Sequence, residues 1–286
     1  MLKTIAHAKI NLTLRILGKE DTGFHLIESI AAFSDFGDHV EIFTNSSCDR
    51  LEISGPFEND LEGENIVVKA LEYFRRETNW TQPVTIKISK QIPVAAGLGG
   101  GSADAACVLK MLNLISPKAK ISKEKMAKIG LTLGSDVPAC LSGKVLKMEG
   151  RGEKLTNIGP IPNIPILLVN PNIKLATKAV FEVFSEKGSF KAINGDANVD
   201  VGEIFRTIEC NAPNDLIEPA IKLAPVIKKV LFALRKLKGI KSVGMSGSGA
   251  TCFALFEPDD KVGIIKAKEQ IKNCGWWTAS TFLKGA

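Results

Sequence analysis

The chain has 286 residues, of which 45% are hydrophobic and 24% charged, with a formal net charge of +6. These values are typical of a globular protein large enough for two domains, and they exclude a disordered chain. Because no apolar run is long enough to span a membrane and charges interrupt the first residues, we expect neither a membrane segment nor a signal peptide and place the protein in the cytoplasm.

The first half of the chain opens with a predicted strand. Over residues 6–16, AHAKINLTLRI, apolar and polar residues alternate, which indicates a half-buried strand with Lys9 and Asn11 on its polar face. The elements predicted next, in chain order, are strands at 39–43 and 51–54, a helix at 64–78 and a strand at 84–90.

A glycine-rich stretch, residues 93–101, separates these elements from a predicted helix at 102–114. Ser102 would cap this helix and Asp104 would lie in its first turn. A second helix, at 122–133, would end at Gly134, and Ser135 and Asp136 would begin a turn. A hairpin around Gly150 and Gly152 is then predicted over residues 144–155.

A proline-rich stretch beginning at Gly159 marks the predicted domain boundary, which divides the chain into residues 1–158 and 159–286. The second half is expected to contain a strand at 164–170, a helix at 176–184, a basic helix at 219–239 and a strand pair around a glycine cluster at 245–250. The predicted class is α+β, with mixed and antiparallel sheets and a cleft between two domains.

The basic charge gathers between residues 219 and 256, where seven lysines or arginines and no acids occur. The apolar residues of this stretch recur at helical spacing, so the lysines and arginines form the solvent-exposed face of an amphipathic helix rather than a nucleic-acid site. A modest positive field of this kind attracts phosphorylated small molecules. The apolar face would consist of Ile221, Ala224, Ile227, Leu231, Leu234 and Leu237.

The six cysteines form no CxxC pair, and the three histidines all lie in the first 39 residues. Reduced thiols, several of them buried, are therefore expected, and no metal-ligating residues are predicted.

The stretch PVAAGLGGGSADAA follows a predicted strand and runs into a predicted helix, which is the arrangement of a phosphate site at a helix N-terminus. It lacks the lysine of a Walker loop, and Ser102 stands where the dinucleotide fingerprint has its third glycine. The nucleophile-elbow pattern fails at Ser102 and Ser248. A flexible turn is the structural alternative, against which the second glycine cluster counts.

This stretch resembles the phosphate loop of the GHMP kinases, the superfamily of galactokinase, homoserine kinase, mevalonate kinase and phosphomevalonate kinase. GMSGSGATCFALF resembles the third glycine motif of the same superfamily, in the expected order. The resemblance implies a two-domain GHMP kinase-like fold with an active-site cleft, ATP as the phosphoryl donor, and Mg²⁺ bridging its β- and γ-phosphates.

Four further stretches resemble the branch of this superfamily that acts on a cytidine-diphosphate-linked methylerythritol: AKINLTLRILGKEDTGFHLIESI, FSDFGD, LGSDVPACLSG and NAPNDLIEPA. The implied partner is this small-molecule substrate, with no nucleic acid and no membrane, and the chain is expected to be a monomer or a weak homodimer.

The resemblance also implies residue roles. Lys9 and Asp136 would be the catalytic pair, in which the carboxylate accepts the hydroxyl proton and the ammonium stabilises the alkoxide. Without the resemblance, Lys9 reads as a surface lysine and Asp136 as a helix N-cap. The residues expected at the ATP phosphates are Pro93, Ala95, Gly97, Leu98, Gly99, Gly100, Gly101, Ser102 and Ala103.

By the same resemblance, His25 would read the cytosine edge and Phe24 would stack on the ring, where many members carry a tyrosine. Phe181 could form the opposite wall, and a core aromatic on an amphipathic helix is an equally good interpretation of it. Asn11 would face the methylerythritol. The other residues expected at the substrate are Thr177, Gly247 and Ser248.

Two rival functions remain at this stage. Another kinase of the superfamily, acting on homoserine or mevalonate, is the nearer rival. The second is a non-catalytic nucleotide-binding or RNA-binding module, against which the presence of both Lys9 and Asp136 counts, since a pure binder needs no base beside an ammonium.

Overall fold

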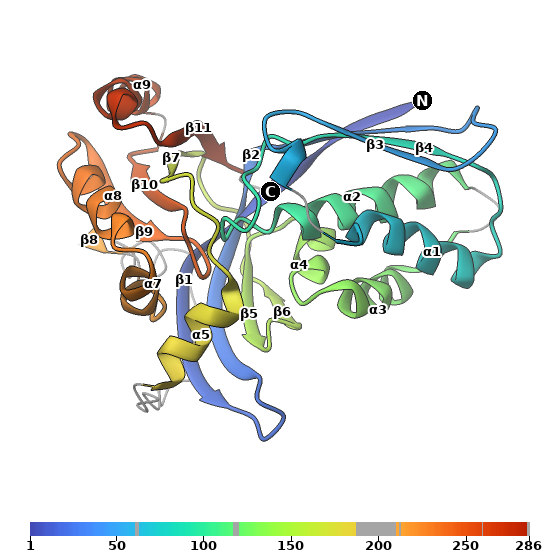
Figure 1. Ribbon diagram of the computed structural model, residues 1–286, viewed down its shortest axis with the longest axis horizontal. Coiled ribbons are helices and arrows are strands. Elements are labelled where there is room, and N and C mark those ends of the chain that lie inside the picture. The colour runs from blue at the N-terminus through green and yellow to red at the C-terminus, as the bar shows by residue number, and fades with distance from the viewer. Residues whose placement is uncertain (61–62, 117–119, 187–209, 212, 259, 285–286) are drawn as a thin grey trace. The chain divides into compact units, whose positions relative to one another are not determined.

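The computed structural model (Figure 1) describes residues 1–286 except 61–62, 117–119, 187–209, 212, 259 and 285–286. The chain divides into two compact units, each assembled from separate stretches. Unit 1 consists of Met1–Lys9, Phe36–Val94 and Gly99–Gly143, and unit 2 consists of Ile10–Asp35, Ala95–Leu98 and Lys144–Ala286. The linear boundary at residue 159 and the expected cleft stay predictions.

The strands of unit 1 are arranged around β4 (Thr85–Ser89). On one side β4 pairs in parallel with β3 (Arg50–Ser54), and on the other it pairs antiparallel with the end of β2 (His25–Phe43). In that register His39 lies opposite Ser89. The predicted strands at 51–54 and 84–90 are thus confirmed to within two residues, and the one at 39–43 is the end of a longer strand.

The α-helices in the described part of unit 1 contact one another (Figure 1) and are α1 (Ile66–Thr78), α2 (Gly100–Ile115), α3 (Lys123–Leu133) and α4 (Val137–Ser142). α1 begins where the Asn65 side chain accepts the Val67 amide, and it buries Phe74 completely. α3 ends at Gly134, as predicted.

The predicted start of α2 was wrong by two residues. Gly99, not Ser102, is its N-cap: it adopts a left-handed conformation with φ of 62°, and its carbonyl accepts the Ala103 amide at 2.8 Å. Glycine takes this conformation without steric cost, which lets the helix begin inside the glycine run. Ser102 is therefore already helical, and Asp104 lies beyond the first turn and is buried.

Unit 2 contains a sheet in the order β11, β7, β10, β9, β8. Its interior strand β7 (Ile164–Asn170) has seven residues, all of them buried, as expected for an apolar run flanked by strands on both sides. β7 pairs antiparallel with β11 (Trp277–Leu283) and β10 (Cys252–Phe256), and β10 pairs with β9 (Ile240–Met245). β8 (Cys210–Asn211) is parallel to β9, so both strand directions occur.

Unit 2 also contains the predicted hairpin. β5 (Leu146–Gly150) and β6 (Lys154–Asn157) pair antiparallel, and β5 also pairs with residues 27–31 of β2. Helix α5 (Thr177–Glu186) agrees with the predicted helix at 176–184, and α9 (Lys261–Ile271) packs against β7 and β11.

The basic helix predicted over 219–239 is two helices, α7 (Ile217–Leu223) and α8 (Val226–Arg235). The break falls at Pro225, which occupies the N-cap of α8 and cannot donate a backbone hydrogen bond inside a helix. The predicted apolar face is nevertheless correct, because Ile227, Leu231 and Leu234 are buried against the sheet of unit 2.

Strand β1 (Leu2–Lys19) is longer than predicted, and its polar face is not exposed to solvent around Lys9 and Asn11. Lys9 and Asn11 are each 3% exposed, although alternation placed them on a solvated face. The apolar residues Ala8, Ile10 and Leu12 are buried as predicted. Protein covers both faces, so each buried polar side chain needs a partner.

Three described cysteines, Cys107, Cys140 and Cys252, are buried free thiols, as expected, whereas Cys48 and Cys274 are exposed. Burial raises the pKa of Cys107 and of Cys140 to about 12, so both stay protonated at neutral pH. Within the described residues, no helix combines the length and the apolar character that a membrane crossing requires.

Candidate active site

Lys9 and Asp136 form an ion pair inside unit 1, with 2.7 Å between Lys9 Nζ and Asp136 Oδ1. The Lys9 side chain is 4% exposed, while that of Asp136 is 34% exposed. The pair therefore combines a buried ammonium group with a carboxylate that solvent can reach. An accessible carboxylate can meet a substrate hydroxyl, and the adjacent ammonium can stabilise the oxyanion left behind.

Asp136 occupies the N-cap position of α4, but its side chain makes no capping hydrogen bond. A capping carboxylate would accept the amide of the second or third helical residue. The second residue here is Pro138, which has no amide hydrogen, so one of those donors is missing. The carboxylate is instead directed to Lys9.

The N-terminus of α2 lies against this ion pair. A Cβ placed on Gly99 would be 3.4 Å from Lys9 Cβ and 3.7 Å from Asp136 Oδ2. The amides of the first helical residues, Gly100, Gly101 and Ser102, have no acceptor within the helix and can donate to an anion. Unit 1 thus brings a helix-end anion site to an ammonium and an accessible carboxylate.

The middle of the phosphate loop belongs to unit 2, where Gly97 approaches the third glycine motif. A Cβ on Gly97 would lie 2.2 Å from the Ser246 carbonyl oxygen and 2.8 Å from that of Gly249. No side chain fits there, so the position requires glycine, which also accommodates its φ of 75°. The remaining predicted loop residues differ in exposure: Pro93, Leu98 and Ala103 are buried, and Ala95 is exposed.

Asn11 is held by two hydrogen bonds within unit 2. Its backbone amide donates to Ser246 Oγ at 3.0 Å, and its side-chain Nδ2 donates to Ser29 Oγ at 2.7 Å. Gly247 is adjacent, since a Cβ on it would lie 3.5 Å from Asn11 Oδ1. The structure therefore brings together Asn11 and Gly247, two residues predicted at the substrate.

His25 lies on an aromatic platform supplied by α5. Its ring stacks on Phe181 with 4.8 Å between ring centroids and meets the edge of Phe184 at 6.1 Å. His25 Nε2 is 2.9 Å from Ser185 Oγ. Burial, and then the charge of Lys19, lower the pKa of His25, which favours a neutral ring with one donor and one acceptor nitrogen.

Phe24 and Thr177 were also predicted at the substrate. Phe24 is 56% exposed, and the guanidinium of Arg151 lies 4.7 Å from its ring centroid. It is His25, not Phe24, that stacks on Phe181. Thr177 is exposed at the start of α5, where its Oγ1 is 2.9 Å from Ser248 Oγ, so two predicted residues from distant parts of the sequence meet.

Sequence reasoning missed a buried ion cluster in unit 1. Lys90 Nζ contacts the carboxylates of Asp38 and Asp104, at 2.7 Å from the latter, and all three side chains are at most 5% exposed. Asp38 also accepts the amide of Ile92 at 2.8 Å. Burial raises the pKa of Asp104 to about 8, and the charge of Asp38 adds to this while Lys90 opposes it. Lys90, just before the glycine stretch, was the available signal.

Sequence reasoning also missed Asn214 and Ser246. Asn214 Nδ2 donates to the carbonyls of Met245 and Gly247, at 2.7 and 2.8 Å, and so supports the third glycine motif. Their only signal was their place in motifs that resemble the superfamily. Among the described residues, no three side chains of the His, Cys, Asp or Glu type gather as a metal site.

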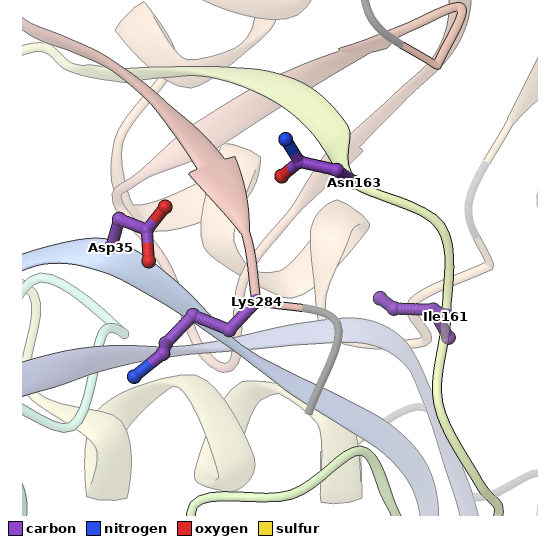
Figure 2. A pocket seen from close by; sticks show the side chains of 4 residues that line it. All are labelled: Asp35, Ile161, Asn163 and Lys284. Carbon is purple, nitrogen blue, oxygen red and sulfur yellow. The ribbon is translucent and has the colours of Figure 1, made fainter.

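An open pocket in unit 2 is lined by Asp35, Ile161, Asn163 and Lys284 (Figure 2). In Figure 2 the Asp35 carboxylate and the Lys284 side chain come from the segments of β2 and β11, and Asn163 comes from the segment before β7. None of the predicted site residues lines this pocket, so we do not connect it with the ion pair.

Family models match two parts of the chain. Residues 65–144 match the GHMP kinases N terminal domain, and residues 197–271 match the GHMP kinases C terminal domain. The first match includes Asp136 and the whole phosphate loop, and the second includes the third glycine motif.

Relatives extend the similarity to nearly the whole chain. A 4-diphosphocytidyl-2-C-methyl-D-erythritol kinase of a Chelativorans species is 40% identical over 98% of this chain and 95% of its own. One from Ruegeria pomeroyi is 39% identical, covering 97% and 98%. A crystal structure of 4-(cytidine 5'-diphospho)-2C-methyl-D-erythritol kinase aligns over 100% of both chains with a TM-score of 0.83 and 28% identity.

Proposed function

Because this chain belongs to the GHMP kinases, we propose that it transfers the γ-phosphate of ATP to the 2-hydroxyl of 4-diphosphocytidyl-2-C-methyl-D-erythritol. Relatives of 39–40% identity over almost the full chain are named for this substrate, which supports the choice over homoserine or mevalonate. The observation that carries the chemistry is the Lys9–Asp136 pair against the N-terminus of α2.

The reaction asks the protein for a base, a positive charge and an anion site. Asp136 accepts the proton of the substrate's 2-hydroxyl while the hydroxyl oxygen attacks the γ-phosphorus of ATP. The bond between that phosphorus and the bridging oxygen then breaks, and the oxygen leaves with ADP. Lys9, held 2.7 Å from the carboxylate, stabilises negative charge on the attacking oxygen. No phosphoenzyme is needed, because the acceptor itself is the nucleophile.

The free amides at the start of α2 hold phosphate oxygens, and the helix dipole adds to the attraction. Mg²⁺, when bound with ATP, would neutralise charge on the β- and γ-phosphates. The carboxylates of Asp38 and Asp104 are already engaged by Lys90, so most magnesium ligands would be phosphate oxygens and water.

We assign recognition of the cytidine end to His25 and Phe181. Because Nε2 is 2.9 Å from Ser185 Oγ, a neutral imidazole would meet the edge of a pyrimidine through one ring nitrogen, as donor or acceptor according to its tautomer. The ring of Phe181 holds that imidazole from one face. Phe24, exposed on the preceding turn, offers an aromatic surface of its own. We expect the enzyme to work in the cytoplasm as a monomer or a weak homodimer.

The test is ADP release with ATP, Mg²⁺ and the cytidyl substrate, run beside Asp136→Ala and beside homoserine and mevalonate as acceptors. Activity restricted to the cytidyl substrate and lost in the variant supports both substrate and base. Comparable turnover of another alcohol would keep the superfamily and discard the substrate. ATP binding without turnover, together with salt-dependent RNA binding, would instead indicate a non-catalytic module.

A further inference from the structure

Three consecutive carbonyl groups of the phosphate loop are bound by donors from elsewhere in unit 2. The Ala95 carbonyl faces the Leu175 amide at 3.5 Å, and the Ala96 carbonyl accepts the Thr251 amide at 3.1 Å. The Gly97 carbonyl accepts the hydroxyl of Ser246 at 2.8 Å. Two of these donors are backbone amides, and Ser246 supplies the side-chain donor.

Anchoring a carbonyl also orients the amide that follows it. In a planar trans peptide the C=O and the N–H point in opposite directions, so the bond to Ser246 turns the Leu98 amide away from Ser246. This peptide needs an external restraint because Gly97, with φ of 75°, has no side chain to limit its rotation. A reversed peptide would replace a donor with a carbonyl oxygen, which repels an anion.

The direction of the Ser246 proton follows from its neighbours. Ser246 Oγ accepts the Asn11 amide at 3.0 Å, and a backbone amide can only donate. The hydroxyl proton is therefore left for the Gly97 carbonyl, which can only accept. Ser246 is fully buried, so water does not compete for either bond.

We propose that Ser246 is a positioning residue that locks the Gly97–Leu98 peptide, so that the phosphate loop presents an amide rather than a carbonyl to the phosphates of ATP. This inference rests on the proposed function, because it assumes that the loop binds ATP. It assigns a task to the third glycine motif: its serine orients the phosphate loop without touching the nucleotide.

The test measures binding of MgADP by titration calorimetry to the full chain and to Ser246→Ala. Loss of one oriented donor should raise the Kd of the variant about tenfold. Ser246→Thr, which keeps the hydroxyl, should bind within about twofold of the parent, given a net hydrogen-bond contribution of this size.

The matched control is Ser116→Ala, which makes the same substitution at another buried serine, at the far end of α2. The Ser116 hydroxyl donates to the Leu112 carbonyl and does not contact the phosphate loop. We expect unchanged MgADP affinity. An equal loss in Ser116→Ala and Ser246→Ala would overturn the proposal, because the effect would then be general loosening.

Two further outcomes separate this inference from the proposed function. Parent-like MgADP affinity in Ser246→Ala overturns the role of Ser246 and leaves the kinase function standing, whereas absence of MgADP binding in the parent chain removes both. If Ser246→Ala does not fold, as judged by thermal melting, Ser246→Cys takes its place. The cysteine side chain is similar in volume to that of serine, but its thiol is only a weak hydrogen-bond donor. It too should weaken binding, and parent-like affinity in it would overturn the proposal.

Discussion

Unit 1 contains two lysine–aspartate sites that use the same chemistry for opposite purposes. In the first, Lys9 is paired with Asp136, whose side chain is 34% exposed. In the second, Lys90 is shared by Asp38 and Asp104, whose side chains are 0% and 5% exposed. The first site can exchange a proton with a substrate, and the second can only hold segments of protein together.

The contrast predicts that access to the acid, and not the residue types, separates the proposed catalytic pair from the buried ion cluster. Asp38 accepts backbone amides as well as Lys90, so its oxygens are already engaged. Asp136 has no capping bond and keeps an oxygen toward the N-terminus of α2. A buried ion cluster that loses its cation is costly, whereas an accessible carboxylate that loses its partner is hydrated.

The largest expected effect is that of removing the accessible base. Asp136→Asn keeps the shape of the side chain but cannot take the hydroxyl proton, so we expect kcat to fall about 10³- to 10⁴-fold. Steady-state kinetics measure this, and MgADP affinity serves as the control for folding. A kcat within tenfold of the parent would assign the base to another group.

Breaking the buried ion cluster of Lys90, Asp38 and Asp104 should instead lower the stability of the protein. Lys90→Met leaves the buried carboxyl groups of Asp38 and Asp104 without their cation and should lower the free energy of unfolding by about 4 kcal/mol, measured in urea. Asp49→Asn is the control at the other end of β4, where Asp49 pairs with Arg75 and accepts the Val84 amide while partly exposed. Equal losses of unfolding free energy in the two variants would contradict the distinction between a buried and a partly exposed ion pair.

Lys9→Met provides the complementary test at the Lys9–Asp136 ion pair. Methionine can fill the space of the buried stem, and Asp136 remains hydrated, so stability should change by less than about 1 kcal/mol. Because the oxyanion loses its stabilising charge, kcat should fall about 10²-fold. Unfolding comparable to that of Lys90→Met, seen in the same urea titration, would mean that Lys9 is structural.

A further prediction concerns the pH dependence of the buried ion cluster. Burial raises the pKa of Asp104 from 3.8 to about 8, so the folded state holds a proton that the unfolded state has released. The stability that this group contributes is therefore complete below its unfolded pKa and is lost as pH rises through the folded one. The loss is at most about 1.4 kcal/mol per pH unit.

Asp104→Asn should remove this dependence. Urea unfolding at several pH values between 5 and 8 would show the parent losing stability relative to the variant as pH rises. Parallel curves for the two proteins would show that Asp104 titrates normally in spite of its burial.

Local sequence patterns were enough to predict much of the architecture. The apolar run at 164–170 is strand β7 with the same ends, Gly134 ends α3, and a hairpin surrounds Gly150 and Gly152. These features depend on local patterns, such as a short apolar run or a glycine at a helix end, which act before tertiary contacts form. The glycine motifs likewise indicated the superfamily, whose models match the chain.

Which polar residues are buried and which stay accessible depends instead on tertiary contacts. Lys9 and Lys90 both occur in or beside alternating strands, and alternation reports the direction of a side chain but not what covers it. What covers a side chain depends on segments far apart in sequence: Lys9 pairs with Asp136, and Ser246 lies 149 residues from Gly97. Because these partners meet only when the chain is folded, the pairing of Lys9, the sealing of Lys90 and the anchoring of Gly97 required the structure.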